Sequence, residues 1–126
     1  MSLSLFRINI EVGDLAEAHR FYAALLGQEG RPQRGQRVYF DAGGVTLQVV
    51  QVEAPHTAVK ALYFLTEDLD AVYTRAEALG CLSKDEVHGE AAGGPVVRPW
   101  GERSFYADDP WGNPLCFVAA GTEFVG

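Results

Sequence analysis

Apolar and polar side chains alternate at the start of this chain, which is the two-residue period of a β-strand. The apolar positions are Phe6, Ile8, Ile10 and Val12. Asp14 follows as a helix N-cap, with Glu17 three residues later in the arrangement of a capping box. Apolar residues then recur at helical spacing until Gly27, which can adopt the left-handed conformation that ends a helix. The pattern predicts a strand over residues 6–12 and a helix that stops at Gly27.

A second segment repeats this order of elements. Residues 61–65 predict a strand, Asp68 an N-cap and Gly80 a helix stop. The buried face of this second helix is predicted to comprise Leu69, Val72, Tyr73, Ala76 and Leu79. The chain therefore contains the same strand–helix unit twice.

Shorter strands are expected after each helix. In the first half we predict a polar loop over residues 28–36 and a hairpin of residues 37–42 and 45–53 turned by Gly43-Gly44. In the second half we predict a strand with a mobile loop over 87–97. Two strands, 103–107 and 115–119, are predicted around the turn of Asp109 to Pro114. The chain then reads as two βαβββ repeats, about 5–53 and about 60–119, with a linker over 54–59. The predicted fold class is α+β: one domain over residues 1–126, with an eight-stranded, incompletely closed sheet around a central cavity.

Composition and charge narrow the function classes. The chain is 48% apolar and 21% charged, so it can form a packed core. Seventeen acidic residues against ten basic ones give a net charge of −7, which argues against nucleic acid or an anionic membrane as partner. We expect no signal peptide and no membrane span. The two cysteines fit reduced thiols, so a cytoplasmic protein is predicted.

Several sequence blocks together carry a resemblance to a known family. They are Val12–Leu15, Arg20–Tyr22, Leu26-Gly27, Glu67–Leu69, Leu79-Gly80, Trp100–Tyr106 and Asp108–Val118. In these blocks the chain resembles the vicinal-oxygen-chelate superfamily, which includes glyoxalase I, bleomycin-resistance proteins, fosfomycin-resistance enzymes and extradiol dioxygenases. The resemblance covers about residues 5–118 and implies the fold. Its members include isomerases, transferases, dioxygenases and non-catalytic drug binders, so it leaves the reaction open.

The resemblance implies four positions at which family enzymes hold a divalent metal with His, Glu or Gln. Here they carry Arg7, Gln48, Ala61 and Cys116. Arginine cannot ligate a metal, alanine has no ligand atom, and a neutral amide and a thiol remain. The histidines lie elsewhere, at His19, His56 and His88. We therefore predict no metal site and no cofactor.

Strand alternation and the resemblance together select residues to line the cavity. The predicted ligand-binding residues are Arg7, Asn9, Gln48, Tyr63, Trp100, Arg103, Tyr106 and Cys116. Tyr106 precedes Cys116 by ten residues, the interval between the catalytic Tyr and the metal-binding Glu of extradiol dioxygenases; the alternative is a core tyrosine. Arg7 either grips a carboxylate or phosphate or forms a structural ion pair with Glu11, Glu102 or a partner subunit.

Cys116 also has two interpretations. It is either a thiol activated by Arg7 on a neighbouring strand or a small buried apolar residue.

The sequence favours a small-molecule-binding protein of the glyoxalase/bleomycin-resistance type that lacks the family metal site. Its ligand would be a small organic molecule, with anions as candidates because of Arg7. No catalytic residue is assigned, and a homodimer is expected from the resemblance. One alternative is a metal-dependent lyase, isomerase or dioxygenase with a displaced site, which would use Gln48, Glu11 and Cys116 or a loop histidine. The other is an interaction module whose cavity is closed by side chains.

Overall fold

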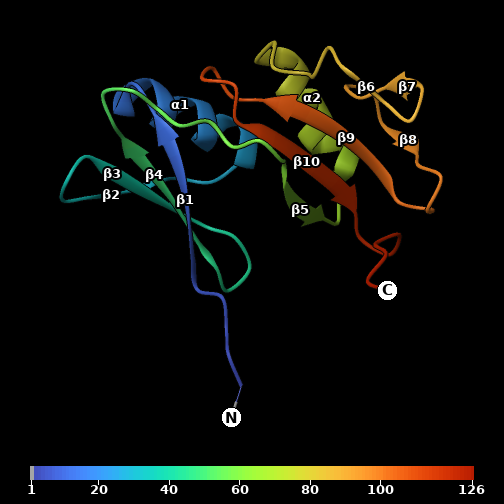
Figure 1. Ribbon diagram of the computed structural model, residues 1–126, viewed down its shortest axis with the longest axis horizontal. Helices are drawn as coiled ribbons and strands as arrows, with labels where there is room; N and C mark the ends of the chain where they lie inside the picture. Colours follow the sequence, from blue (N-terminus) through green and yellow to red (C-terminus); the bar gives the residue numbers. More distant parts are fainter. Residues whose placement is uncertain (1) are drawn as a thin grey trace. The chain divides into compact units, whose positions relative to one another are not determined.

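The computed structural model describes residues 2–126 and divides the chain into two units, with the boundary between Thr57 and Ala58 (Figure 1). Unit 1 precedes the boundary and unit 2 follows it. Each unit has one helix and its own four-stranded sheet, and unit 2 adds a two-stranded sheet. The predicted α+β class and the two βαβββ repeats are confirmed.

Unit 1 is the first repeat. Its elements are β1 (Arg7–Val12), α1 (Leu15–Leu26), β2 (Arg31–Gln33), β3 (Arg37–Asp41) and β4 (Thr46–Gln51). The sheet order is β1-β4-β3-β2, with β1 parallel to β4 and the other pairs antiparallel. The predicted strand 6–12, helix and hairpin are all present.

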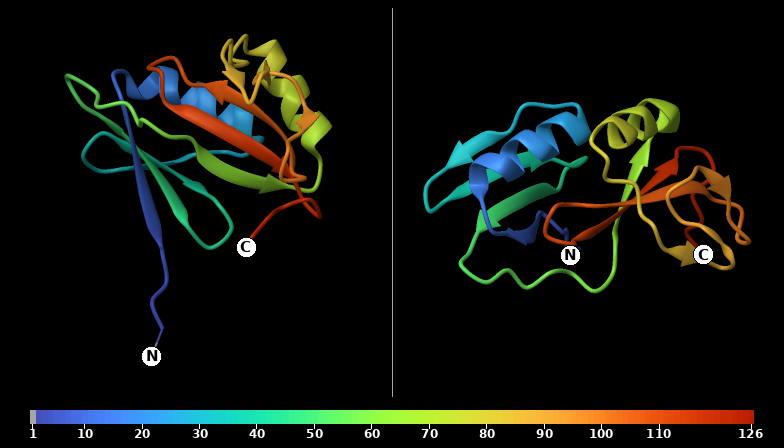
Figure 2. Two further views of the ribbon diagram at one scale, coloured as in Figure 1. Left: turned by 45° about the vertical axis from the view of Figure 1, so that its right-hand side comes forward. Right: turned by 90° about the horizontal axis from the view of Figure 1, so that it is seen from above.

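Helix α1 begins and ends where its capping residues predict. The Asp14 side chain accepts a hydrogen bond of 2.8 Å from the Glu17 backbone N–H, which satisfies one of the free donors of the first turn. At the other end Gly27 has φ 66°, the left-handed conformation that glycine adopts without strain. The helix lies along one face of its sheet (Figure 2, right), where Tyr22 meets Phe40 with ring centroids 6.1 Å apart.

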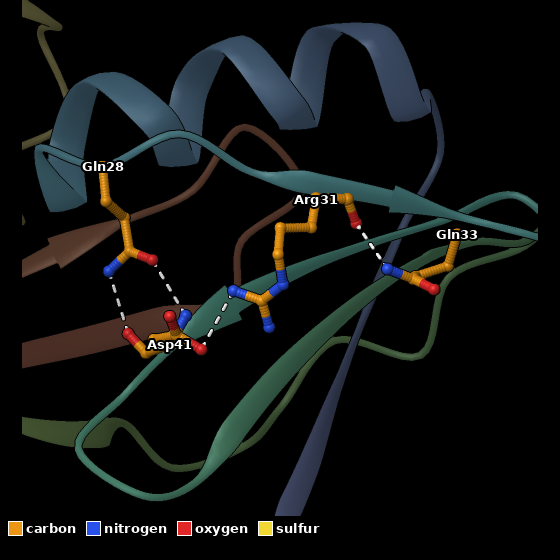
Figure 3. Close-up of polar contacts among 4 residues, drawn as sticks. All are labelled: Gln28, Arg31, Gln33 and Asp41. Atoms are coloured by element: carbon orange, nitrogen blue, oxygen red, sulfur yellow. Dashed lines mark hydrogen bonds and ion pairs between the residues drawn. The ribbon is translucent and has the colours of Figure 1, made fainter.

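Strand β2 lies inside the segment predicted as a loop, so that prediction is wrong. All three of its residues are exposed, so no alternation of apolar residues marks it as a strand. It is held by backbone pairing to β3 and by polar contacts shown in Figure 3. Arg31 forms an ion pair of 3.0 Å with Asp41, and the Gln28 amide exchanges two hydrogen bonds with the Asp41 backbone.

Unit 2 is the second repeat. Its elements are β5 (Leu62–Thr66), α2 (Leu69–Ala78), β6 (Glu86–Val87), β7 (Glu90–Ala91), β8 (Val96–Val97), β9 (Arg103–Asp108) and β10 (Pro114–Ala119). The main sheet has the order β5-β10-β9-β8, with β5 parallel to β10, and β6 pairs only with β7. As in unit 1, the first strand of the repeat lies beside the last one, and the two remaining strands of the sheet follow in reverse order.

Three phenylalanines form the core of unit 2 on the side of the sheet that α2 covers. Phe117 stacks on Phe64 and on Phe105, each with ring centroids 5.3 Å apart. Tyr73 of α2 meets Phe105 edge to face at 5.5 Å. Asp68 caps the helix, accepting a hydrogen bond of 3.1 Å from the Ala71 N–H. Side chains alternate along a strand, so the residues next to Phe105 in β9 and next to Phe117 in β10 point to the face of the sheet away from α2.

Three details of the predicted packing are wrong. Residues 87–97 do not form one strand: His88 and Gly89 turn the chain with φ 52° and 77°, so β6 and β7 form a small hairpin. Leu79 is the C-cap of α2 rather than part of its buried face, and it is 37% exposed. The first strand begins one residue later than predicted, so Phe6 precedes β1, and it is 65% exposed.

Within residues 2–126, neither helix combines the length and apolar character needed to cross a bilayer.

Candidate functional site

In unit 1, the face of the sheet opposite α1 carries polar side chains from three strands. Asn9 of β1 and Tyr39 of β3 are both register partners of Gln48 in β4, so the three lie side by side across the sheet. Their neighbours Leu47 and Val49 point the other way and are buried against α1. Gln48, one of the predicted ligand-binding residues, therefore lies on the face of β4 that points away from α1.

Gln48 is the buried member of this group, with 6% of its surface exposed. Its Nε2 donates a hydrogen bond of 2.8 Å to Oδ1 of Asn9. Its Oε1 is buried and has no hydrogen-bond partner within residues 2–126. An unpaired buried carbonyl oxygen costs about 1–3 kcal/mol, so Oε1 is an acceptor that a donor group would stabilise.

Arg7 is exposed, and two aromatic rings hold its guanidinium. Its Cζ lies 5.0 Å from the ring centroid of Phe6 and 5.6 Å from that of Tyr39. Among the described residues of unit 1 Arg7 forms no ion pair, so the alternative pairing with Glu11 is not formed. Cation–π contacts fix the guanidinium plane while leaving its N–H groups free to donate.

In unit 2, the face opposite α2 carries a pair of tyrosines. Tyr63 of β5 and Tyr106 of β9 flank Cys116 of β10 as its register partners. The two hydroxyl oxygens are 3.0 Å apart, and the rings meet edge to face. Burial raises the pKa of Tyr106, and the hydrogen bond with Tyr63 raises it further, so its hydroxyl is protonated at neutral pH.

Cys116 is fully buried beneath this pair, and burial raises the pKa of its thiol to about 11. The hydrogen bonds from Tyr106 and Ser104 and the charge of Arg98 act in the opposite direction but do not outweigh burial. The neighbours of β10 are β5 and β9, whereas β1 belongs to the other sheet. The prediction that Arg7 lies on a strand next to Cys116 is therefore wrong, and the cation that acts on this thiol is Arg98.

Arg98 was not among the predicted ligand-binding residues, yet it is the largest fully buried side chain, with 2% of its surface exposed. Its Nε donates to Ser104 Oγ at 3.0 Å, and its Nη2 donates to the carbonyls of Ser104 at 3.1 Å and Ala92 at 3.3 Å. Its Cζ lies 5.4 Å from the ring centroid of Tyr106. Its Nη1 is buried without a hydrogen-bond partner in the described part of the chain.

Two other predicted residues form polar contacts outside the tyrosine pair. Trp100 donates from Nε1 to Oε1 of Glu102 at 2.7 Å. Arg103 alternates with Ser104 along β9, so it points to the α2 side of the sheet, where it pairs with Asp70 at 2.9 Å. Their roles in ligand binding stay predictions.

The residues at the four positions implied for a metal do not make a suitable donor set. Arg7 brings a fixed positive charge, Ala61 a methyl group, and Cys116 a thiol that stays protonated at neutral pH. Gln48 is left with a single amide oxygen. Across residues 2–126, no group of three or more His, Cys, Asp or Glu side chains is placed to hold a metal ion.

Comparisons with known proteins agree with this architecture. A family model described as "Glyoxalase-like domain" matches residues 7–118. A glyoxalase/bleomycin resistance protein from Albidiferax ferrireducens T118 is 23% identical, with a TM-score of 0.75 over 91% of this chain and 98% of its own. A lactoylglutathione lyase from Agrobacterium tumefaciens is 25% identical, with a TM-score of 0.65 over 93% of each chain. The oxidase ChaP-H2 is 24% identical, with a TM-score of 0.72 over the full length of both chains. No curated protein matches the sequence.

Proposed function

The chain belongs to the glyoxalase-like domain family, and we propose that it is a metal-independent member that binds a small organic anion. The chemistry at the four metal positions supports the first part of this proposal. A divalent ion would have to sit beside the cation of Arg7, with no ligand from Ala61 and with a protonated thiol at Cys116.

Arg7 is the observation that carries the second part. Its guanidinium is exposed, in cation–π contact with two rings, and forms no ion pair with a carboxylate in the described residues. A planar guanidinium can donate two parallel hydrogen bonds to a carboxylate or phosphate, and its stacking on Phe6 and Tyr39 lowers the entropy lost when it does so. The adjacent Gln48 supplies an unpaired amide oxygen for a donor group of the same ligand.

The test uses simple aromatic probes that differ in charge: benzoate, phenyl phosphate and the neutral benzamide. Titrations followed by amide and arginine side-chain NMR give the affinity of each. We expect R7A to weaken benzoate and phenyl phosphate at least tenfold and benzamide little. R7K should lie between, because lysine keeps the charge but loses the two-pronged donor.

Arg31→Ala is the matched control. Arg31 is also an exposed arginine on the unit 1 sheet, but its charge is already paired with Asp41. Equal affinity of the anions for wild type and R7A would show that Arg7 has no part in binding. If none of the three probes binds, the proposed function itself is wrong.

A metal-dependent lyase or dioxygenase is the second candidate. The unpaired Oε1 of Gln48 and the similarity to a lactoylglutathione lyase favour it. Such an enzyme would need a displaced site built on Gln48 with Glu11, Cys116 or a loop histidine. Elemental analysis of untagged protein purified without chelator distinguishes the two: near one equivalent of a transition metal would support the enzyme, and less than about a tenth would support the metal-independent binder.

The assembly state belongs to the same proposal. Because the sequence resembles a superfamily whose members of this length are usually homodimers, we propose that the protein is a homodimer. Light scattering coupled to size-exclusion chromatography measures the mass directly, and 13.7 kDa would mark a monomer.

A further inference from the structure

We propose that the Tyr63–Tyr106 hydroxyl pair of unit 2 binds an oxyanion of an organic ligand, and that buried Arg98 is the positioning residue whose charge makes the pair prefer an anion. This inference rests on the proposed function and adds to it the class of ligand group that unit 2 recognises. It uses no contact between the two units.

The hydroxyl pair has one hydrogen left to donate. Two phenols carry two O–H groups. When Tyr106 donates across the 3.0 Å contact to Tyr63 rather than to Cys116, the Tyr63 O–H is left to donate. The remaining O–H belongs to whichever hydroxyl accepts the first bond, and a donor that also accepts is strengthened by its partner. Tyr63 is 59% exposed, so this end of the pair is open to a ligand.

Arg98 places a positive charge directly behind this donor without a matching carboxylate. It forms no salt bridge within residues 2–126, and its three hydrogen bonds go to neutral oxygens of Ser104 and Ala92. The buried acid Glu102 accepts hydrogen bonds from Trp100 Nε1 and from the Phe124 N–H. A buried guanidinium is costly unless an anion compensates it, so an arriving anion gains more here than a neutral molecule does.

The charge reaches the ligand through Tyr106. The guanidinium carbon lies 5.4 Å from the centre of the Tyr106 ring, and the ring carries the hydroxyl that pairs with Tyr63. A cation beside the ring draws electron density from the phenol, which makes its hydroxyl a better donor. Low dielectric around a buried charge also lengthens the reach of its attraction. Both effects favour a carboxylate or phenolate oxygen over a neutral carbonyl.

A purely structural role for Arg98 has to be distinguished from this one. Its Nη2 ties the Ala92 carbonyl to β9, and that function depends on hydrogen bonds rather than on charge reaching a ligand. If the role were only structural, replacing Arg98 would lower stability and weaken benzoate and benzamide alike. If the charge acts on the ligand, the ratio of the two affinities must fall.

The experiment is an NMR titration of protein labelled with ¹³C at the tyrosine ζ carbons, with benzoate and benzamide as probes. We expect benzoate to shift the Tyr63 and Tyr106 signals saturably and to bind at least tenfold more tightly than benzamide. Tyr73 is the internal control, because it lies on the α2 side of the sheet and should not shift. Read from the Tyr63 and Tyr106 signals, the ratio of benzoate to benzamide affinity should fall close to one in R98M and stay at least threefold in R98K.

The outcomes separate this inference from the proposed function. Benzoate that shifts Tyr39 alone and depends on Arg7 would overturn the inference and leave the proposed function standing. Equal affinities of benzoate and benzamide at Tyr63 and Tyr106 would do the same. No saturable shift with either probe or with phenyl phosphate overturns both. Should R98M fail to fold, Y63F decides: it removes one hydroxyl at an exposed site, and unchanged benzoate affinity would refute the hydroxyl pair as the binding group.

Discussion

Alkylation of Cys116 is the sharpest test of the electrostatics in unit 2. A thiolate is the species that iodoacetamide attacks, and burial raises the pKa of this thiol from 9.0 to about 11. A shift of two units leaves about 100-fold less thiolate at pH 8. A more basic thiolate is also a better nucleophile, which recovers about tenfold of that loss. Ionisation alone therefore predicts a rate about tenfold below that of the unfolded chain.

Burial slows the reaction further. Cys116 has no exposed surface, so the reagent can reach it only when β10 separates locally from its neighbours. The assay is a time course with iodoacetamide at pH 8, read by peptide mass spectrometry, with the same protein in urea as the reference. Cys81 is the internal control: burial also raises its pKa to about 11, but it keeps 8% of its surface exposed, so it should react faster than Cys116.

A Cys116 rate equal to or above that of the unfolded chain would refute this reasoning. It would mean that Arg98 and the hydrogen bonds from Tyr106 and Ser104 outweigh burial and stabilise a thiolate. The interpretation of Cys116 as a reactive thiol would then return. A slow rate supports the other interpretation, in which Cys116 is a small buried apolar residue beneath the tyrosine pair.

Two further predictions concern the folding of each unit. D14A should lower the free energy of unfolding by about 1 kcal/mol in urea titrations, because the Glu17 N–H loses its acceptor. D14S keeps an acceptor and should cost less. Equal midpoints for D14A and wild type would contradict the capping role. F117A should cost about 3–5 kcal/mol, since Phe117 lies between two stacked rings in the core; a loss below about 1 kcal/mol by the same method would show that this core collapses around the gap.

The elements that the sequence predicts well are those defined by local chemistry. Asp14, Gly27 and Asp68 satisfy or end the backbone hydrogen bonding of a helix within one turn, so the sequence around them suffices. Alternation works for β4 because one face packs against a helix and the other does not. Strand β2 has no such signal, since its residues are all exposed and its order comes from pairing with β3.

The site was harder to predict because burial of a charged residue is a tertiary property. No pattern in the sequence around Arg98 predicts that its guanidinium contacts Ser104, Ala92 and Tyr106 in the interior. Arg103 is different: alternation from Tyr106 inward places Ser104 on the same face and Arg103 on the other, as observed. For Arg103, the two-residue period of the strand therefore predicts the correct face of the sheet, whereas its position in the Trp100–Tyr106 block does not.

The two repeats share a construction but differ in how they present positive charge, and this difference bears on the ligand. Arg7 is exposed in unit 1 and Arg98 is buried in unit 2, and neither forms an ion pair in the described residues. An exposed guanidinium can bind an anion directly, whereas a buried one can only bias a neighbouring donor. Each unit therefore offers an anion a different kind of contact, and the variants of Arg7 and Arg98 test the two contacts separately.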